Sequence, residues 1–210
     1  MHSIRFNLQR ITMSENLNQL LENNQQWVKK TQQKNPEFFN HLGAMHAPKY
    51  LWIGCADARV PANTIVNIPA GDLFVHRNVG NVVSSADANI KAVISYAVRF
   101  LKVKHIIVTG HYDCGAVKAS LEGGEYRGVD HWLHNIKIVI EENKAEISAM
   151  HGKEKIDRTC ELNVQAQVKN VSKFDAVQEA WTNGEKLTIH GWVYAVENGL
   201  IKDLNISKSG

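Results

Sequence analysis

Short apolar runs alternate with segments of helical periodicity along this chain. Three of these runs predict buried strands, at Tyr50–Gly54, Leu73–Arg77 and His105–Thr109. Helices are predicted at Asp87–Leu101, Asp113–Leu121, Val129–Glu146 and Glu154–Trp181, the last broken near Val171-Ser172. Strands that alternate with helices predict an α/β fold with a mostly parallel β-sheet flanked by helices.

The two ends of the chain carry different patterns. Leu17–Thr31 has an approximate helical stripe of apolar residues, which we expect to pack on something outside its own segment. Pro36 opens a second short helix that Gly43 helps to end. Near the C-terminus, Leu187–Val196 and Leu200–Ile206 are joined by an Asn-Gly turn. This arrangement predicts a β-hairpin that adds an antiparallel edge strand.

Length and composition favour one ordinary globular domain. The chain has 210 residues, 44% of them hydrophobic, and a net charge of +3. That balance gives no strong case for a nucleic-acid or membrane partner. No apolar run approaches the roughly 20 residues that a membrane-spanning helix needs. We therefore expect a flexible extension over residues 1–14 and a single domain over 15–210, whose residues 15–44 form a helical dimerisation arm.

Three cysteines are too few for a disulfide framework, so a reducing compartment is favoured and the cytoplasm is the default location. The N-terminus offers a weak alternative. Arg5 and Arg10 precede the first acidic residue, Glu15, as in transit peptides of organelles. Met13 could equally be the true start, so the organelle matrix is the second choice.

Two motifs carry the candidate chemistry. Cys55-Ala-Asp57-Ala-Arg59 and His111-Tyr-Asp-Cys114 each follow a predicted strand. The carboxyl ends of neighbouring parallel strands lie at one edge of a sheet, which would bring the motifs together. Two thiolates and an imidazole suit Zn²⁺, and three protein ligands leave a fourth position open, as in catalytic sites. Since two thiolates cancel the metal charge, we expect activity to require alkaline pH.

Asp57 and Arg59 add a second function to the first motif. In an extended segment, side chains at i, i+2 and i+4 share a face, so Cys55, Asp57 and Arg59 would line one cleft. Asp57 could accept a hydrogen bond from a metal-bound water or swing inward as a fourth ligand. Arg59 would hold it back through a bidentate ion pair. The alternative is a surface salt bridge beside a structural zinc. Cys160 is the spare thiol on a predicted helix, and a core or surface position is favoured for it over a role as a fourth ligand.

The chain resembles the β-class carbonic anhydrases from about Leu20 to about Leu204. Besides the two motifs, the resemblance rests on Leu51–Cys55, Arg59–Ala62, Phe74–Asn78, Glu161–Asn163 and His190–Tyr194. It implies that Cys55, His111 and Cys114 hold one zinc per chain, and that zinc-bound hydroxide attacks CO₂ to give bicarbonate and a proton. It also implies four parallel strands with an edge strand, and a homodimer or dimer-of-dimers tetramer in which the N-terminal helices embrace the partner.

A narrower resemblance is to a bacterial subgroup regulated by bicarbonate. In that subgroup the counterpart of Asp57 closes over zinc at low pH, and bicarbonate favours the closed form from a separate pocket. The pocket side chains match Trp52, Arg77 and Tyr194, all hydrogen-bond donors suited to an oxyanion. Four departures stand against a full match. His46 replaces a glutamine of the cleft, Asn63 replaces an acidic residue, Gly80 stands where alanine is frequent, and the chain ends earlier than many relatives do.

The sequence leaves two other functions open. The same fold could hydrolyse a CO₂-like molecule such as carbonyl sulfide or carbon disulfide, because cleft shape alone would separate the two activities. A zinc protein without catalysis could instead sense bicarbonate through the second pocket. The intact pair of Asp57 and Arg59 favours catalysis, because a sensor would not need an open metal position.

Overall fold

A computed structural model describes residues 17–44 and 46–210 of the chain. The described residues fall into two units that divide at position 45. The expected extension over residues 1–14 lies outside the described residues, and the expected arm over 15–44 lies inside them from Leu17 onward. The assignment of residues 15–44 to dimerisation stays a prediction.

The first unit consists of two helices, α1 (Leu17–Lys34) and α2 (Phe38–Ala44). The expected helices are present, but Gly43 lies inside α2 and does not end it. Trp27 of α1 packs edge-to-face on Phe39 of α2, with ring centroids 5.4 Å apart. No residue of α1 is buried, so the predicted apolar stripe remains exposed.

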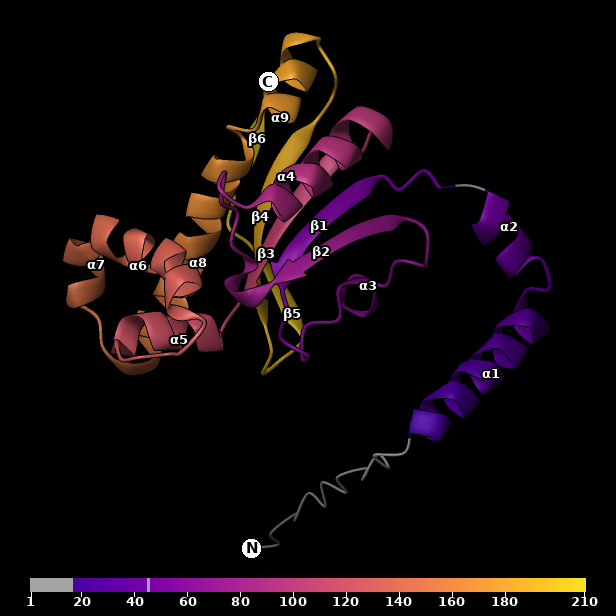
Figure 1. The fold of residues 1–210 in the computed structure, drawn as a ribbon, viewed down its shortest axis with the longest axis horizontal. Coiled ribbons are helices and arrows are strands. Elements are labelled where there is room, and N and C mark those ends of the chain that lie inside the picture. Colours follow the sequence, from indigo (N-terminus) through magenta and orange to yellow (C-terminus); the bar gives the residue numbers. More distant parts are fainter. Residues whose placement is uncertain (1–16, 45) are drawn as a thin grey trace, which may run out of the picture. The chain divides into compact units, whose positions relative to one another are not determined.

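The second unit is built on one sheet with the strand order β2-β1-β3-β4-β5 (Figure 1). Its strands are β1 (Tyr50–Cys55), β2 (Leu73–Asn78), β3 (His105–His111), β4 (Thr188–Ala195), β5 (Leu200–Asp203) and the short β6 (Lys208–Ser209). Strands β1 to β4 are parallel, while β5 and β6 both run antiparallel to β4. The predicted fold class and the C-terminal hairpin are confirmed.

One face of the sheet carries the main core. Helices α4 (Ala88–Ser95), α8 (Gly152–Val171) and α9 (Asp175–Thr182) cover this face with buried aliphatic side chains. The Asp87 side chain accepts a hydrogen bond from the Asn89 backbone N–H and so caps α4. The helix predicted to continue to Leu101 changes into a π-helical turn, η2 (Tyr96–Phe100). The opposite face holds a smaller cluster with Trp52 and Ile107, covered in part by the short helix α3 (Ala62–Ile65).

Three further helices gather near the carboxyl ends of β1 and β3 (Figure 1). They are α5 (Gly115–Glu122), α6 (Asp130–Glu142) and α7 (Lys144–Ser148). The single helix expected over Val129–Glu146 is wrong, because Asn143 interrupts it. The start expected for the helix at Asp113 is also wrong, because Asp113 has φ of 60° and α5 begins at Gly115.

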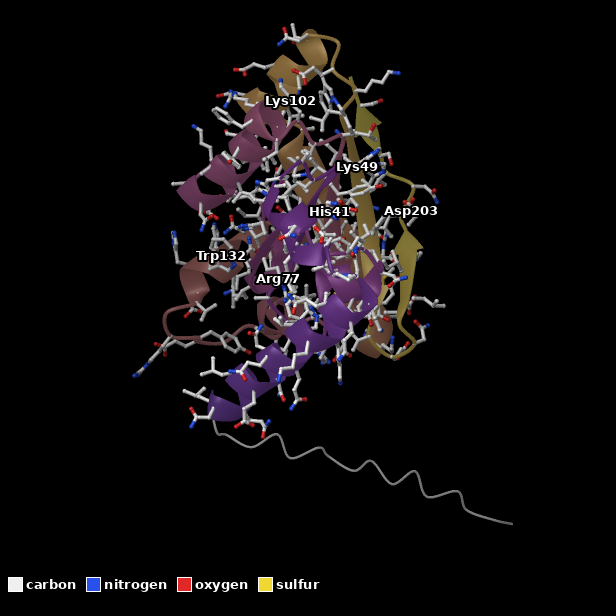
Figure 2. All side chains as sticks on the ribbon, turned by 90° about the vertical axis from the view of Figure 1, so that its right-hand side faces the viewer. His41, Lys49, Arg77, Lys102, Trp132 and Asp203 are labelled. Atoms are coloured by element: carbon white, nitrogen blue, oxygen red, sulfur yellow. The ribbon has the colours of Figure 1, made fainter. Side chains whose placement is uncertain are left out.

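The direction of the parallel strands determines which edge of the sheet carries their carboxyl ends. Lys49 and Lys102, just before β1 and β3, lie toward the upper end of the sheet in Figure 2, and Arg77 near the end of β2 lies lower. The carboxyl ends therefore lie at the lower edge in this view. Within residues 17–44 and 46–210, none of the helices has the length and apolar character that a membrane crossing requires.

Candidate metal centre

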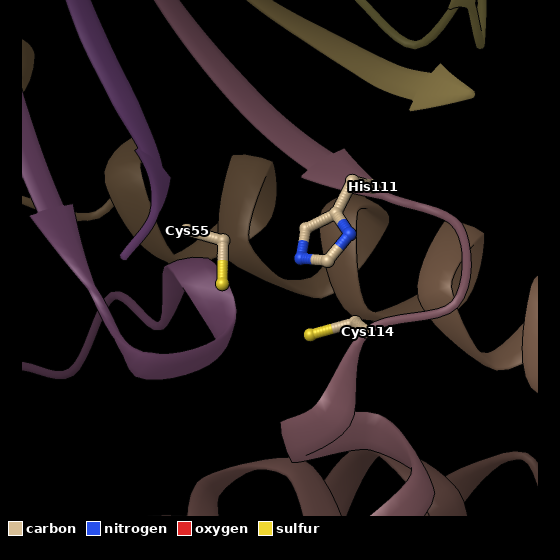
Figure 3. Close-up of side chains that lie close together, drawn as sticks. All are labelled: Cys55, His111 and Cys114. Carbon is tan, nitrogen blue, oxygen red and sulfur yellow. The ribbon is translucent and has the colours of Figure 1, made fainter. Parts of the chain in front are cut away.

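Cys55, His111 and Cys114 come together at the carboxyl edge of the sheet. Cys55 ends β1, His111 ends β3, and Cys114 is the residue that caps α5. Neighbouring parallel strands bring the first two together, since Gly54 pairs with Thr109. The turn through Tyr112 and Asp113 then returns the chain so that Cys114 faces the same point (Figure 3).

The three side chains form a compact and buried set of ligands. One potential ligand atom from each residue lies within 4.8 Å of the other two. The exposed fractions are 6% for Cys55, 1% for His111 and 2% for Cys114. A buried cluster with this many polar atoms is costly unless its members are paired or coordinate an ion. The sequence prediction that the topology unites the two motifs is correct in this geometry.

The imidazole of His111 is prepared for a metal. Its Nδ1 donates a hydrogen bond to the Tyr112 carbonyl oxygen at 2.9 Å, which fixes the proton on Nδ1. The lone pair therefore lies on Nε2, a fully buried atom without a hydrogen-bond partner. Metal-binding histidines commonly donate their other ring N–H to a carbonyl in this way. The residues present therefore fit a zinc ion, which requires a neutral imidazole and thiolates.

The two thiols influence each other strongly. A hydrogen bond from Cys114 is the largest influence on Cys55 and lowers its pKa well below the ordinary value, although burial opposes this. The same contact raises the pKa of Cys114, because a second negative charge would then stand beside the first in a buried place. A divalent cation would remove that repulsion, so the pair suits a metal better than two free thiolates.

Cys160 does not belong to the ligand set. It is 2% exposed on α8, and burial raises its pKa to about 12. Among the described residues, the metal-capable group contains the other two cysteines and His111 alone. Cys160 is a core residue and not a fourth ligand, as the sequence favoured.

Asp57 and Arg59 form the expected ion pair, but the expected reason is wrong. The strand ends at Cys55, and Asp57 to Val60 form a tight turn closed by a backbone hydrogen bond of 3.0 Å. The turn, and not strand alternation, brings the two side chains together. Arg59 Nε and Nη2 donate to the two Asp57 oxygens at 3.0 and 2.7 Å, and the Arg59 backbone N–H adds a third bond at 2.9 Å.

This pair lies directly beside the metal-binding side chains. Asp57 Oδ2 is 3.7 Å from His111 Nε2. The hydrogen bonds from Arg59 hold the pKa of Asp57 well below its usual range. Arg59 also contacts Asp113 at 3.2 Å, and Asp113 in turn pairs with Lys118. Sequence reasoning missed Asp113, whose side chain becomes a second acceptor for Arg59 because of the turn before Cys114.

Arg77 lies closer to the metal centre than its sequence position suggested. Its Nε donates to the Cys55 carbonyl oxygen at 2.7 Å, and its Nη2 donates to the Asp57 carbonyl oxygen. Trp52 lies on the same face of the sheet as Arg77. Trp52 and Gly54 are two residues apart on β1 and so share a face, and Gly54 is in register with Arg77 on β2. Tyr194 on β4 pairs with His111 on the neighbouring strand β3, and its side chain is half-buried. The grouping of Trp52, Arg77 and Tyr194 into one pocket stays a prediction.

Two departures noted in the sequence have local explanations. His46 is exposed and packs edge-on against Phe74, with ring centroids 6.2 Å apart. Asn63 donates to the carbonyl oxygens of Ile68 and Pro69 and so braces the loop after α3. Neither side chain contacts the metal-binding residues.

Comparison with known proteins gives the same result as the geometry. The carbonic anhydrase family model matches residues 50–201. A carbonic anhydrase of Emericella nidulans is 44% identical over 91% of this chain and 84% of its own length. One from Pseudomonas aeruginosa is 35% identical over 80% of this chain and 79% of its own length. The fungal protein is more similar than this bacterial one, so the comparisons do not confirm the bacterial subgroup.

Solved structures agree in fold. A tetrameric β-carbonic anhydrase from Sordaria macrospora has a TM-score of 0.88 and 39% identity, covering 92% of this chain and 98% of that one. The Coccomyxa β-carbonic anhydrase, in complex with acetazolamide, has a TM-score of 0.90 and 39% identity, covering 94% of this chain and 90% of that one. Together with the Cys55, His111 and Cys114 centre, these matches show that the chain belongs to the β-carbonic anhydrases and is an enzyme of that family.

Proposed function

We propose that this protein hydrates CO₂ reversibly to bicarbonate and a proton, using one zinc ion held by Cys55, His111 and Cys114. The buried, unpartnered Nε2 of His111 between two thiols is the observation that carries the proposal. Zinc bound there would supply the Lewis acid that lowers the pKa of a bound water and makes it nucleophilic. The chain itself fixes the tautomer of His111 through the Tyr112 carbonyl and keeps the ligands out of bulk water.

Asp57 is proposed to orient the reacting groups and to gate the site. Its carboxylate lies next to His111 and accepts hydrogen bonds from Arg59 on both oxygens. In this arrangement a lone pair of Asp57 can accept a proton or a hydrogen bond from a group in the cleft. The Arg59 side chain is 46% exposed and also binds Asp113, so Arg59 can release the Asp57 carboxylate and keep its ion pair with Asp113. Release of Asp57 would free it to take the open ligand position and stop turnover.

Regulation by bicarbonate is the finer part of the proposal. Trp52 Nε1 is a fully buried donor without a partner, and Thr109 Oγ1 and Trp192 Nε1 share that condition. Thr109 on β3 is in register with Gly54 on β1 and with Trp192 on β4. Arg77 on β2 is in register with Gly54 from the other side. Unpaired buried donors cost about 1–3 kcal/mol each, so an oxyanion beside Arg77 would be stabilised there.

Arg77 offers a physical link between such an anion and the gate. Its guanidinium holds the backbone carbonyls of Cys55 and Asp57. A bicarbonate ion that attracted Arg77 would weaken its hold on the segment that carries Asp57. The resemblance to the regulated bacterial subgroup, with Tyr194 as a third pocket residue, enters the proposal on this basis.

The protein is proposed to self-associate and to act in the cytoplasm. The Sordaria relative is tetrameric, and four apolar side chains of α1 are exposed: Leu17, Leu20, Leu21 and Trp27. A homodimer, or a tetramer made of two dimers, would cover them. The cytoplasm is proposed as the location because all three cysteines are unpaired thiols.

The experiment is stopped-flow CO₂ hydration on zinc-quantified protein from roughly pH 7 to 9, where a metal-bound water is expected to ionise. Cys55→Ser and His111→Ala should lose zinc and activity together, while Cys160→Ser, the buried thiol outside the ligand set, should keep both. Full activity in metal-depleted protein would contradict the zinc mechanism. Bound zinc without hydration at any pH would favour a CO₂-like substrate or a bicarbonate sensor.

The regulatory pocket needs its own variants. Arg77→Ala and Tyr194→Phe should weaken inhibition by bicarbonate more than they weaken hydration. Inhibition curves that match those of the parent in both variants would remove the pocket from the proposal.

A further inference from the structure

A sharp turn follows β2 and lies against the metal centre. It is the 3-10 turn η1 (Val79–Asn81), in which Gly80 has φ of 77°. A Cβ on Gly80 would lie 2.8 Å from Ile136 Cδ1 and 3.1 Å from Ala116 Cβ. Glycine is therefore required here both by the left-handed backbone and by the close approach of α5 and α6. The Asn78 side chain closes the turn with two hydrogen bonds of 2.8 Å to the Val82 backbone.

Strand pairing places this turn beside Cys55. Cys55 is in register with Asn78, and the Ala56 N–H donates to the Asn78 carbonyl at 2.8 Å. Gly80 follows two residues later. The hydrogen bond from Cys114 is the main cause of the lowered pKa of Cys55, and the backbone N–H groups of Asp57 and Gly80 lower it further. The turn thus supplies a main-chain donor to one of the metal-binding thiolates.

The peptide unit that contains this N–H is held from the other side by Trp132. The Trp132 indole N–H donates to the Val79 carbonyl oxygen at 2.7 Å. In a planar trans peptide, the carbonyl of one residue and the N–H of the next point in opposite directions. Trp132 on α6, labelled to the left of Arg77 in Figure 2, therefore grips one end of the unit while the Gly80 N–H faces Cys55 at the other.

The following peptide unit is held by α8. Asn163, 1% exposed, donates to the Gly80 carbonyl at 2.9 Å. Gln167 donates to Asn163 Oδ1 at 2.9 Å, and its own Oε1 accepts the Val83 N–H at 2.9 Å. Both peptide planes that meet at Gly80 are thus fixed, one by α6 and one by α8. Together these bonds fix the direction in which the Gly80 N–H points.

We propose that Trp132 and Asn163 are positioning residues that aim the Gly80 N–H at the Cys55 sulfur and thereby tune the metal bound there. The inference rests on the proposed zinc site. An N–H···S hydrogen bond withdraws electron density from a thiolate, which lowers its donation to the metal. The metal then remains a stronger Lewis acid despite its two anionic ligands. The hydrogen bond therefore offsets part of the loss of Lewis acidity that two thiolate ligands cause.

Trp132→Phe is the main test, because it keeps a ring and removes the N–H. In cobalt-substituted protein, the thiolate-to-cobalt charge-transfer band should move to longer wavelength, because the thiolate lone pair is no longer stabilised. In the zinc enzyme the midpoint of the activity–pH curve should move to higher pH, with a turnover roughly tenfold lower at neutral pH, as for other groups behind a metal ligand. Trp181→Phe is the matched control. Trp181 lies on α9, and its indole N–H donates a similar hydrogen bond, of 2.8 Å, to the Leu187 carbonyl oxygen.

A second pair of variants tests the other clamp. Asn163→Ala should shift the band and the pH midpoint in the same direction as Trp132→Phe. Asn143→Ala, which removes a comparable bond of 2.8 Å to the Val139 carbonyl, should shift neither. If the band and the midpoint of Trp132→Phe match those of the parent, the inference is wrong while the metal site stands. If the parent shows no thiolate-to-cobalt band, the proposed metal site fails and this inference fails with it.

Discussion

Glu161→Gln tests how a buried carboxylate stabilises the region behind the metal centre. The Glu161 side chain is 12% exposed and accepts three hydrogen bonds, from Lys202 at 2.7 Å, Tyr112 at 2.8 Å and Arg158 at 2.9 Å. Glutamine keeps the shape but removes the charge that these donors share. It therefore isolates electrostatics from packing.

The expected loss is about 2 kcal/mol of unfolding free energy at pH 7. A hydrogen bond to a charged group contributes about 1.5–3 kcal/mol. The lower part of the range applies, because Lys202 is 59% exposed and can return to water, and Arg158 keeps its bond to Glu146. Glu179→Gln is the control: it removes a similar two-bond pair with Arg99 whose side chains are 55% and 38% exposed. That change should cost less than about 1 kcal/mol.

The pH dependence has a definite sign. Burial alone would raise the pKa of Glu161, but the hydrogen bonds from Lys202, Tyr112 and Arg158 outweigh it, so the pKa of Glu161 in the folded protein lies below its ordinary value. A lowered folded pKa stabilises the protein above the unfolded pKa, and this contribution disappears as the pH falls through the folded pKa. The difference between parent and Glu161→Gln should therefore be constant from pH 7 to about 5 and shrink below about 4.

Urea unfolding followed by tryptophan fluorescence, at one protein concentration, measures these differences. Activity should stay within a few-fold of the parent, because the Tyr112 backbone is held independently by its 3.0 Å bond to the Tyr194 carbonyl. A loss below about 0.5 kcal/mol at pH 7, equal to that of the surface control, would refute the reasoning. So would a difference that does not shrink in acid.

Three further predictions concern the gate, the core and the metal. Arg59→Gln should reduce hydration more at pH 7 than at pH 9, since Asp57 loses the side chain that holds it off the ligand position; an equal loss at both pH values in stopped-flow assays would contradict the gate. Gly191→Ala should cost about 1–3 kcal/mol in urea unfolding, because the new Cβ would lie 2.5 Å from Ile206 Cδ1, whereas Gly43→Ala meets no atom within 4 Å and should cost nothing. Chelation of the metal should lower the thermal midpoint, and Zn²⁺ but not Mg²⁺ should restore it; recovery with Mg²⁺ would speak against a thiolate site.

The sequence by itself determined the sheet and the metal ligands. Short apolar runs such as Tyr50–Gly54 favour buried strands, and their alternation with helices favours a parallel sheet, which the strand pairing confirms. In a parallel sheet the residues after two neighbouring strands must lie at one edge. Cys55, His111 and Cys114 were therefore predictable as one centre, although 56 positions separate Cys55 from His111.

Only the tertiary structure decided how that centre is supported. The turn that joins Asp57 to Arg59 begins where the strand ends, and a pattern of residues does not fix that point to within one residue. The grip of Arg77 on the Cys55 carbonyl, and of Trp132 on the Val79 carbonyl, depends on strand register and helix packing. Their partners are backbone atoms, which are chemically alike at every position. Sequence identifies side chains that can donate, but the backbone carbonyl that each one reaches is determined only when distant elements pack together.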